Sequence, residues 1–293
     1  MLDLTAETSM TKQIDRRLPG IGYLFNIFLD SVFPHKCLAC RCFFQPSYQN
    51  RKGSSEPAPD TGIQPKSEIN KPFNPFVCPD CRHGILHSVP PICRRCGVSF
   101  HSREGENHLC EACITLPGNF RMARAPFIYE RTLVNLIHRF KYDGKTQLAK
   151  PFREFLFTML VRSWNIEDID MILPVPLHRR RFRARGFNQS FLLAQFMKPE
   201  KVNKAENIDN IPIEKDILLR IRQTKPQTEL RRNDRFANIR NAFDIRHHER
   251  IIGKRILLVD DVLTTGATVD ECARLLLKHG VEQVDVLTLA RAV

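Results

Sequence analysis

The strongest constraint on the fold is an apolar run at residues 256–259, which leads directly into the acidic pair Asp260 and Asp261. An uninterrupted apolar stretch is typical of a parallel strand that is buried on both faces of a sheet. Ligands of open α/β sheets bind where such strands end. The acidic pair is therefore predicted to lie at a ligand-binding edge.

The turn after the acidic pair has the composition of a phosphate-binding loop. Two apolar residues, Val262 and Leu263, lead into the loop itself, which consists of Thr264, Thr265, Gly266, Ala267 and Thr268. Its backbone N–H groups, and the positive end of a helix that begins near Thr268, can bind a phosphate. Acidic pairs also follow strands in phosphoacceptor sites and solvated turns, but those turns do not require a hydroxyl-rich loop. We therefore predict a site for a phosphorylated sugar.

The second half of the chain alternates between strand and helix patterns. Helices are expected over residues 132–140, 148–161 and 269–278, and strands over residues 125–129, 169–175 and 284–290. Such alternation predicts an α/β domain with a parallel sheet that is flanked by helices. We assign this domain to residues 120–293.

The first half of the chain is dominated by cysteine. Of the ten cysteines, eight form four C-x-x-C pairs: Cys37/Cys40, Cys78/Cys81, Cys93/Cys96 and Cys110/Cys113. Each such turn lets two thiolates bind one ion, and two turns complete a closed tetrahedral zinc site. Two structural Zn²⁺ sites would use all eight. No export signal is recognised, so we expect a reducing cytoplasm, where metal ligation is favoured over disulfides.

The pairing of these turns is only partly determined by spacing. The short segment from Cys96 to Cys110 favours a compact ribbon from the last two turns, which leaves the first two to share the other ion. A nested arrangement, in which the first and last turns share one ion, stays open. Cys42 is interpreted as a free thiol near a site. Five histidines are alternative ligands but are expected at the surface: His35, His83, His87, His101 and His108.

Three further segments complete this half of the chain. Residues 37–116 are predicted to form a double zinc-ribbon region, with a flexible, polar insertion at residues 45–72. Residues 1–36 are predicted to include an amphipathic helix, since their apolar stretch is too short and too polar for a transmembrane segment. We expect that helix to pack on its own protein rather than on a membrane surface.

The charge balance and one arginine-rich segment both indicate polyanionic partners. The formal net charge is +13, from 45 Lys+Arg and 32 Asp+Glu. Five arginines follow the predicted turn Pro174, Val175 and Pro176: Arg179, Arg180, Arg181, Arg183 and Arg185. Guanidinium groups pair bidentately with phosphate oxygens, so a flexible run here could bind a pyrophosphate or a nucleic-acid backbone. A solvated basic loop is the alternative.

Two predictions follow from the chain beyond this arginine run. Asn188 is predicted to cap the helix that comes next. A third basic segment, at residues 220–240, has the composition of a mobile loop that closes over a ligand or of a strip that binds nucleic acid.

Together these motifs resemble, in order and spacing, the ComF family of competence phosphoribosyltransferases. The motifs are the C-x-x-C pairs, the segments at residues 174–181 and 185–189, the basic segment at residues 226–238 and the acidic pair with its loop. The resemblance implies a type I phosphoribosyltransferase fold preceded by a small N-terminal double zinc-ribbon domain. The insertion after Cys42 departs from the shorter family pattern.

The resemblance also implies a ligand and its contacts. Phosphoribosyl pyrophosphate (PRPP) would be bound with Mg²⁺, and Asp260 and Asp261 would be the catalytic residues that hold the ribose hydroxyls. The loop at residues 264–268 would hold the 5-phosphate, with Val262 and Leu263 before it also in the PRPP site. The backbone of residues 173–177 would hold the pyrophosphate, bordered by the arginines. Further implied partners are single-stranded DNA and other competence proteins.

Two functions are compatible with these motifs. The first is transfer of a phosphoribosyl group from PRPP to an acceptor during DNA uptake in natural transformation. The second is non-catalytic binding of single-stranded DNA, with PRPP as a regulatory or structural ligand. No residue identifies the acceptor.

Overall fold

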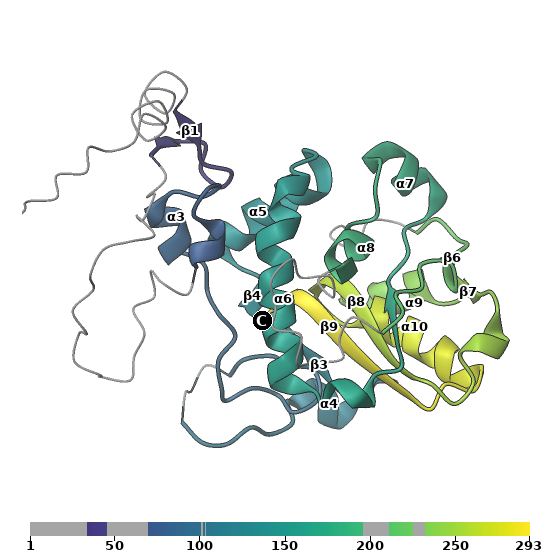
Figure 1. Ribbon diagram of the computed structural model, residues 1–293. Helices are drawn as coiled ribbons and strands as arrows, with labels where there is room; N and C mark the ends of the chain where they lie inside the picture. Colours follow the sequence, from purple (N-terminus) through teal and green to yellow (C-terminus); the bar gives the residue numbers. More distant parts are fainter. Residues whose placement is uncertain (1–33, 46–69, 101, 103, 196–210, 225–231) are drawn as a thin grey trace, which may run out of the picture.

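The computed structural model describes residues 34–45, 70–100, 102, 104–195, 211–224 and 232–293 (Figure 1). The predicted N-terminal helix and most of the predicted insertion lie outside these residues. None of the helices in the described ranges combines the length and the apolar composition that crossing a bilayer requires.

A parallel sheet forms the centre of the molecule. Its strands are β3 (Ala123–Arg124), β4 (Phe127–Ile128), β5 (Met171–Pro174), β8 (Arg255–Leu263) and β9 (Gln283–Arg291). The order is β3-β9-β8-β5, with β4 also paired to β9, and every pairing is parallel. Strand β5 accompanies β8 only as far as Val259, whereas β9 accompanies it to Leu263. The acidic pair therefore lies on β8 just beyond the end of its neighbour β5.

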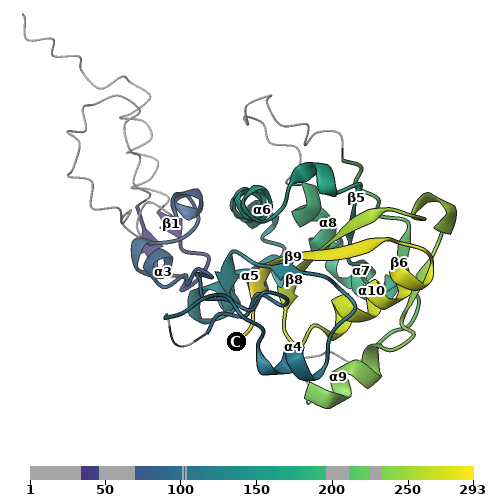
Figure 2. The same ribbon diagram turned by 90° about the horizontal axis from the view of Figure 1, so that it is seen from below.

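Helices cover both faces of this sheet (Figures 1 and 2). On one face lie α5 (Arg131–Tyr142), α6 (Ala149–Ser163) and α8 (Gln189–Ala194), and on the other lies α10 (Ala267–Lys278). Alternate residues of β8 point to opposite faces. Leu257 and Val259 pack with the first group of helices, and Ile256 and Leu258 pack with α10. The predicted parallel sheet flanked by helices is confirmed.

Shorter elements surround this framework. An antiparallel pair, β6 (Leu218–Arg220) and β7 (Phe243–Ile245), lies near α7 (Arg179–Arg185) and α9 (Arg232–Ile239). The cysteine region contributes β1 (His35–Lys36), β2 (Phe43–Phe44), α3 (Pro79–His83) and α4 (Glu111–Thr115). Single 3-10 turns occur at Lys71–Phe73, Thr146–Leu148, Ile166–Asp168 and His248–Arg250.

The cysteine region packs directly on the α/β domain. Phe73 is fully buried, and its ring lies 5.7 Å from that of Phe152 and 5.3 Å from that of Phe155, both on α6. Cys37 and Cys78 belong to the same buried cluster as α5 and α6. The first part of the ribbon region thus shares its core with the domain that follows.

The buried carboxylate of Asp285 connects several residues at the amino-terminal edge of the sheet by hydrogen bonds. Asp285 on β9 accepts hydrogen bonds from Arg121 Nε at 3.0 Å and from Trp164 Nε1 at 3.0 Å. Replacement by alanine leaves both donors without their acceptor, so Asp285→Ala should lower the free energy of unfolding by about 3 kcal/mol. Urea denaturation followed by the fluorescence of Trp164, the only tryptophan, measures this.

The matched control is Glu282→Ala, which changes an exposed carboxylate in the neighbouring turn. It should change the free energy of unfolding by less than about 0.5 kcal/mol. Equal effects of the two substitutions would contradict the role given to Asp285.

Candidate functional site

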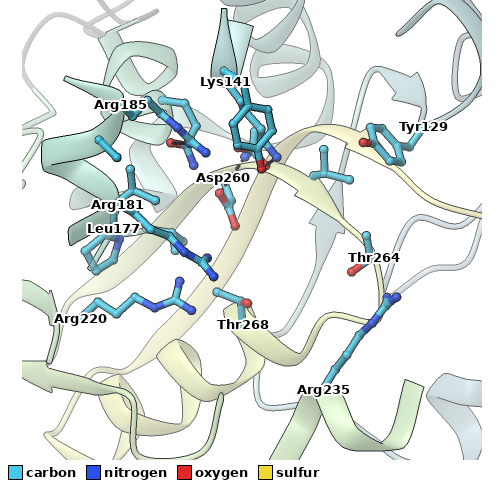
Figure 3. Close-up of a pocket in the computed structure, with 17 residues that line it drawn as sticks. Tyr129, Lys141, Leu177, Arg181, Arg185, Arg220, Arg235, Asp260, Thr264 and Thr268 are labelled. Atoms are coloured by element: carbon cyan, nitrogen blue, oxygen red, sulfur yellow. Dashed lines mark hydrogen bonds and ion pairs between the residues drawn. The ribbon is translucent and has the colours of Figure 1, made fainter. Parts of the chain in front are cut away.

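A cavity of about 420 Å³ opens at the carboxyl ends of β5 and β8 (Figure 3). It brings together nine of the residues predicted from the sequence: Val175, Pro176, Arg181, Arg185, Asp260, Asp261, Val262, Thr264 and Thr268. Leu177, at the end of the predicted pyrophosphate turn, and Arg220 and Arg235, from the predicted basic segment, also line it. The remaining lining residues are Tyr129, Lys141, Tyr142, Ala184 and Gln189. Two segments that are about 85 positions apart in the chain thus form one site, as expected for the carboxyl edge of a parallel sheet.

The other predicted residues lie outside the cavity wall. Pro174, Leu263, Thr265, Gly266 and Ala267 belong to the same two segments but do not line it. Arg179, Arg180 and Arg183 are exposed on α7 and do not line it either.

The acidic pair is buried and held by specific partners. Asp260 Oδ1 accepts hydrogen bonds from Ser190 Oγ and from the Asp261 backbone N–H, each at 2.8 Å. Lys141 Nζ forms an ion pair with Asp261 Oδ1 at 2.8 Å. Asp261 Oδ2 is also buried but has no hydrogen-bond partner among the described residues. This oxygen is available to a ligand or a cation.

Burial changes the titration of these groups. Loss of solvent, reinforced by the neighbouring Asp261, raises the pKa of Asp260 to about 7. Burial alone would lower the pKa of Lys141, but the adjacent Asp261 raises it. Lys141 therefore stays charged and compensates one of the two carboxylates.

Lys141 was not among the predicted site residues, because it follows the helix predicted over residues 132–140. One signal was present. Lys141 falls four residues after Ile137, so it continues the apolar face of Leu133, Ile137 and Phe140 on α5. A lysine on a buried helix face needs a charged partner, and the acidic pair supplies one.

The wall opposite the Thr264 loop is strongly basic. Arg181 and Arg220 extend toward Asp260, with Arg185 above them (Figure 3). Burial first, and then the adjacent Arg181, lowers the pKa of Arg220 to about 10, and its Nε has no hydrogen-bond partner in the described part of the chain. The lining contains five cations, Lys141, Arg181, Arg185, Arg220 and Arg235, against two carboxylates. This excess of positive charge suits a polyanionic ligand.

The predicted pyrophosphate turn offers fewer backbone donors than expected. Pro174 and Pro176 have no N–H group, and the Val175 N–H donates to the Val259 carbonyl at 2.9 Å. These three residues can shape the cavity, but they cannot donate backbone hydrogen bonds to it. Such donors begin at Leu177, which lines the cavity.

The arginine run after this turn forms a helix, so the expected flexible run is wrong. Helix α7 begins after His178, whose side chain accepts a hydrogen bond from Arg180 N at 3.3 Å. It ends at Gly186, where φ is +82°. The predicted cap at Asn188 is confirmed, because its side chain accepts from Ser190 N at 3.0 Å. The helix places only Arg181 and Arg185 in the cavity wall.

The cysteines form two four-membered clusters, and the pairing favoured from spacing is confirmed. Cys37, Cys40, Cys78 and Cys81 make up the first cluster, and Cys93, Cys96, Cys110 and Cys113 the second. The nested alternative is wrong. In each cluster the ligand atoms all lie within 4.8 Å of one another. No histidine in the described residues belongs to either.

The clusters have the geometry of tetrahedral thiolate sites. Sγ atoms of Cys40 and Cys78 are 3.8 Å apart, and those of Cys96 and Cys110 are 3.7 Å apart. Zinc–sulfur bonds of about 2.3 Å place the corners of a tetrahedron about 3.8 Å apart. The residues present therefore fit a structural zinc ion in each cluster.

Neighbouring thiols shift each other's pKa in opposite directions. The hydrogen bond between Cys40 and Cys42 lowers the pKa of Cys40 to about 6 and raises that of Cys42 to about 12. The hydrogen bond between Cys93 and Cys96 lowers the pKa of Cys93 to about 3 and raises that of Cys96. Cys42 Sγ is exposed and 3.0 Å from Cys40 Sγ. It is the thiol beside the site that the sequence indicated, and it lies outside the group of four.

Comparison with known proteins supports a phosphoribosyltransferase-type domain in the second half of the chain. A family model described as a phosphoribosyl transferase domain matches residues 204–292. The competence protein F of Haemophilus influenzae is 30% identical over 222 residues, which cover 74% of this chain and 90% of that protein. The chain belongs to the ComF family.

Two further relatives extend this relationship. The DNA utilization protein YhgH of Escherichia coli K12 is 32% identical over 220 residues, 73% of this chain and 90% of that protein. The competence protein ComFC of Bacillus subtilis is 27% identical over 228 residues, 78% of this chain and 82% of that protein. The predicted fold class, a phosphoribosyltransferase domain after a double zinc ribbon, is thereby confirmed.

The raised pKa of Asp260 predicts a pH-dependent stability. Because the folded state binds this proton more tightly than the unfolded chain, stability should fall as pH rises from about 4 to about 7. The side-chain amide of an Asp260→Asn variant lacks this titration, but its oxygen can still accept from Ser190 and the Asp261 N–H. Between about pH 5 and pH 8, the variant should gain about 1–3 kcal/mol relative to wild type. The free energy of unfolding of both proteins is measured by urea denaturation at each pH. If it changes with pH by the same amount in the variant and in wild type, the prediction is wrong.

The clusters predict the metal content. Purified protein should contain two zinc ions per chain, and Cys81→Ser should lower the content by one because it removes a ligand of the first cluster. Cys42→Ser is the matched control and should leave the content unchanged. Inductively coupled plasma mass spectrometry measures all three proteins, and a loss of zinc from the Cys42 variant would show that this thiol is a ligand.

Proposed function

We propose that this ComF-family protein binds PRPP with Mg²⁺ in the cavity and transfers its phosphoribosyl group to a nitrogen nucleophile. The observation that carries the proposal is the layout of the cavity. A buried acidic pair lies between a threonine-rich loop at the start of a helix and a wall of arginines (Figure 3). This order matches the order of charge in PRPP, which has a phosphate at one end, hydroxyls in the middle and a pyrophosphate at the other end.

In this proposal each part of the ligand meets a group of matching chemistry. Thr264 and Thr268 lie on the side that would receive the 5-phosphate, where α10 begins and its N-terminal N–H groups favour an anion. Asp260 and Asp261 would accept hydrogen bonds from the ribose hydroxyls. Arg181 and Arg220 would pair with the pyrophosphate oxygens.

The acidic pair also fits Mg²⁺. Carboxylate oxygens are the ligands that this cation prefers, and Asp261 Oδ2 is buried without a hydrogen-bond partner among the described residues. When bound, Mg²⁺ would supply positive charge that neutralises the leaving pyrophosphate. Lys141 would hold Asp261 in place, and Ser190 would hold Asp260.

The residues would act mainly by placement and charge. During transfer the bond from ribose C1 to the pyrophosphate oxygen breaks, a bond from C1 to the acceptor nitrogen forms, and pyrophosphate leaves with the bonding electrons. Positive charge that grows on the ribose is stabilised by nearby carboxylates, and negative charge on pyrophosphate by arginines.

We further propose a role in DNA uptake in the cytoplasm, since relatives carry the names competence protein F and DNA utilization protein YhgH. Helix α7 favours a second candidate function, non-catalytic binding of single-stranded DNA with PRPP as a structural or regulatory ligand. Its Arg179, Arg180 and Arg183 are exposed outside the cavity, and Phe182 between them is 49% exposed. Exposed arginines with an interleaved aromatic ring suit a nucleic-acid strand. Other competence proteins are further candidate partners.

The test combines two sets of substitutions. An Asp260→Asn/Asp261→Asn variant should lose Mg²⁺-dependent PRPP binding and pyrophosphate release but should still bind single-stranded DNA. An Arg179→Gln/Arg180→Gln/Arg183→Gln variant should keep PRPP affinity, and its slope of log affinity against log salt should become shallower by about 2. Calorimetry with PRPP, a coupled pyrophosphate assay and DNA titration between about 50 and 200 mM salt measure these effects.

The outcomes separate the two functions. PRPP binding without pyrophosphate release, across candidate acceptors that include DNA, would leave only the second. Absence of PRPP binding by the wild-type protein in the presence of Mg²⁺ would contradict both.

A further inference from the structure

The second cysteine cluster is linked through one arginine to the loop after the acidic pair. Arg291, the last residue of β9, lies between them. Its Nε donates to the Cys96 carbonyl at 3.1 Å, and its Nη2 lies 3.5 Å from Cys96 Sγ. Its Nη1 donates to the carbonyls of Leu263, at 3.0 Å, and Thr264. One guanidinium therefore joins a ligand of the second cluster to the start of the threonine loop.

These bonds orient the loop backbone. In a trans peptide, the carbonyl of one residue and the N–H of the next point in opposite directions. Because the carbonyls of Leu263 and Thr264 face Arg291, the N–H groups of Thr264 and Thr265 face away from it. Thr264 itself lines the cavity. Arg291 thus fixes the direction of the first two N–H groups in the predicted phosphate loop.

A second link ties the chain that leaves this cluster to the helix after the loop. Asn119 follows α4, which contains Cys113, and Asp270 lies in the first turn of α10. Asp270 accepts from the Asn119 backbone N–H and, at 2.9 Å, from Asn119 Nδ2. A methyl group at Gly118 would come within 2.7 Å of Asp270 Oδ1, so the contact is close. The loop is held at its start by Arg291 and beyond its end by Asn119.

The first cluster has no such link. It lies beside β1 and α3, away from α4 and β3 (Figures 1 and 2). Hydrogen bonds of its four cysteines in the described residues stay within residues 37–82. The two clusters therefore differ in what they support.

We infer that the second cluster is part of the phosphate-binding site, and that Arg291 is the positioning residue through which it holds the 5-phosphate loop. A zinc ion with four thiolates carries net negative charge, which a guanidinium at Cys96 Sγ balances. Metal occupancy at this cluster then controls the shape of the loop, whereas occupancy at the first cluster does not. The inference rests on the proposed function for the identity of the ligand, but not for the link itself.

The main test compares Arg291→Gln with Arg255→Gln. Arg255 is a matched control because it also makes several hydrogen bonds from β8, to Asp168 and Asp170, at the opposite, amino-terminal end of the sheet. Both proteins should fold and retain two zinc ions. Only Arg291→Gln should show faster millisecond hydrogen exchange at the amides of residues 264–268. Arg291→Lys, which keeps the charge without the fork of donors, should fall between it and wild type.

Ligand binding gives an independent readout. Calorimetry with ribose 5-phosphate should show at least about tenfold weaker binding for Arg291→Gln, since a misoriented loop loses charge-assisted hydrogen bonds to the phosphate. Binding of Mg²⁺ with pyrophosphate alone should stay within about twofold of wild type, because that anion meets the arginine wall. Equal weakening for both ligands, or none for either, would overturn the inference.

Cysteine variants test the metal dependence. Cys110→Ser, in the second cluster, should reproduce the exchange and ribose 5-phosphate effects, and Cys81→Ser, in the first, should not. If the two variants have identical effects, both clusters contribute only to general stability, and the inference is overturned. If wild type binds neither PRPP nor ribose 5-phosphate, the proposed function fails, while the exchange comparison still decides whether the cluster holds the loop.

Discussion

The site depends on two adjacent carboxylates that are held out of water on one strand. Two adjacent buried carboxylates are unfavourable without compensation, because each loses its hydration and like charges repel. Lys141 compensates Asp261 with an ion pair, and Ser190 and a backbone N–H stabilise Asp260. Helices α5 and α8 must therefore pack against β8 at this point. The position of these two helices on the sheet therefore depends on the need to compensate the carboxylates of β8.

The cysteine region consists of short helices and strands, which need a source of stability other than their own packing. Each second C-x-x-C turn starts a five-residue helix, α3 or α4, and the strands beside the first cluster, β1 and β2, are two residues long. Elements of this size bury too little apolar surface to be stable alone. Packing on the α/β domain stabilises them, and a zinc ion, which each cluster fits, would add to this. The same packing brings the second cluster next to Arg291, which links it to the threonine loop.

Patterns with a strong local cause were predictable. The apolar run of β8, the helical spacing of α5 and α10 and the Asn188 cap each depend on neighbours within a few residues. The pairing of adjacent C-x-x-C turns was predictable because a compact ribbon needs the shorter connection. Helix α7 was not predicted, because a run of arginines has no apolar periodicity.

The sequence by itself determined the strand, the acidic pair, the threonine loop and the two sets of metal ligands, because those signals lie in contiguous residues. Tertiary structure alone decided which groups meet the acidic pair. Lys141 and Ser190 contact the pair from distant segments, and Arg220 lines the same cavity, because of how the helices and β6 pack on the sheet. It also decided that Arg291 joins Cys96 to the loop, since that contact spans 195 positions of the chain. Spacing along a chain does not encode such distances, because they arise only when the strands pair.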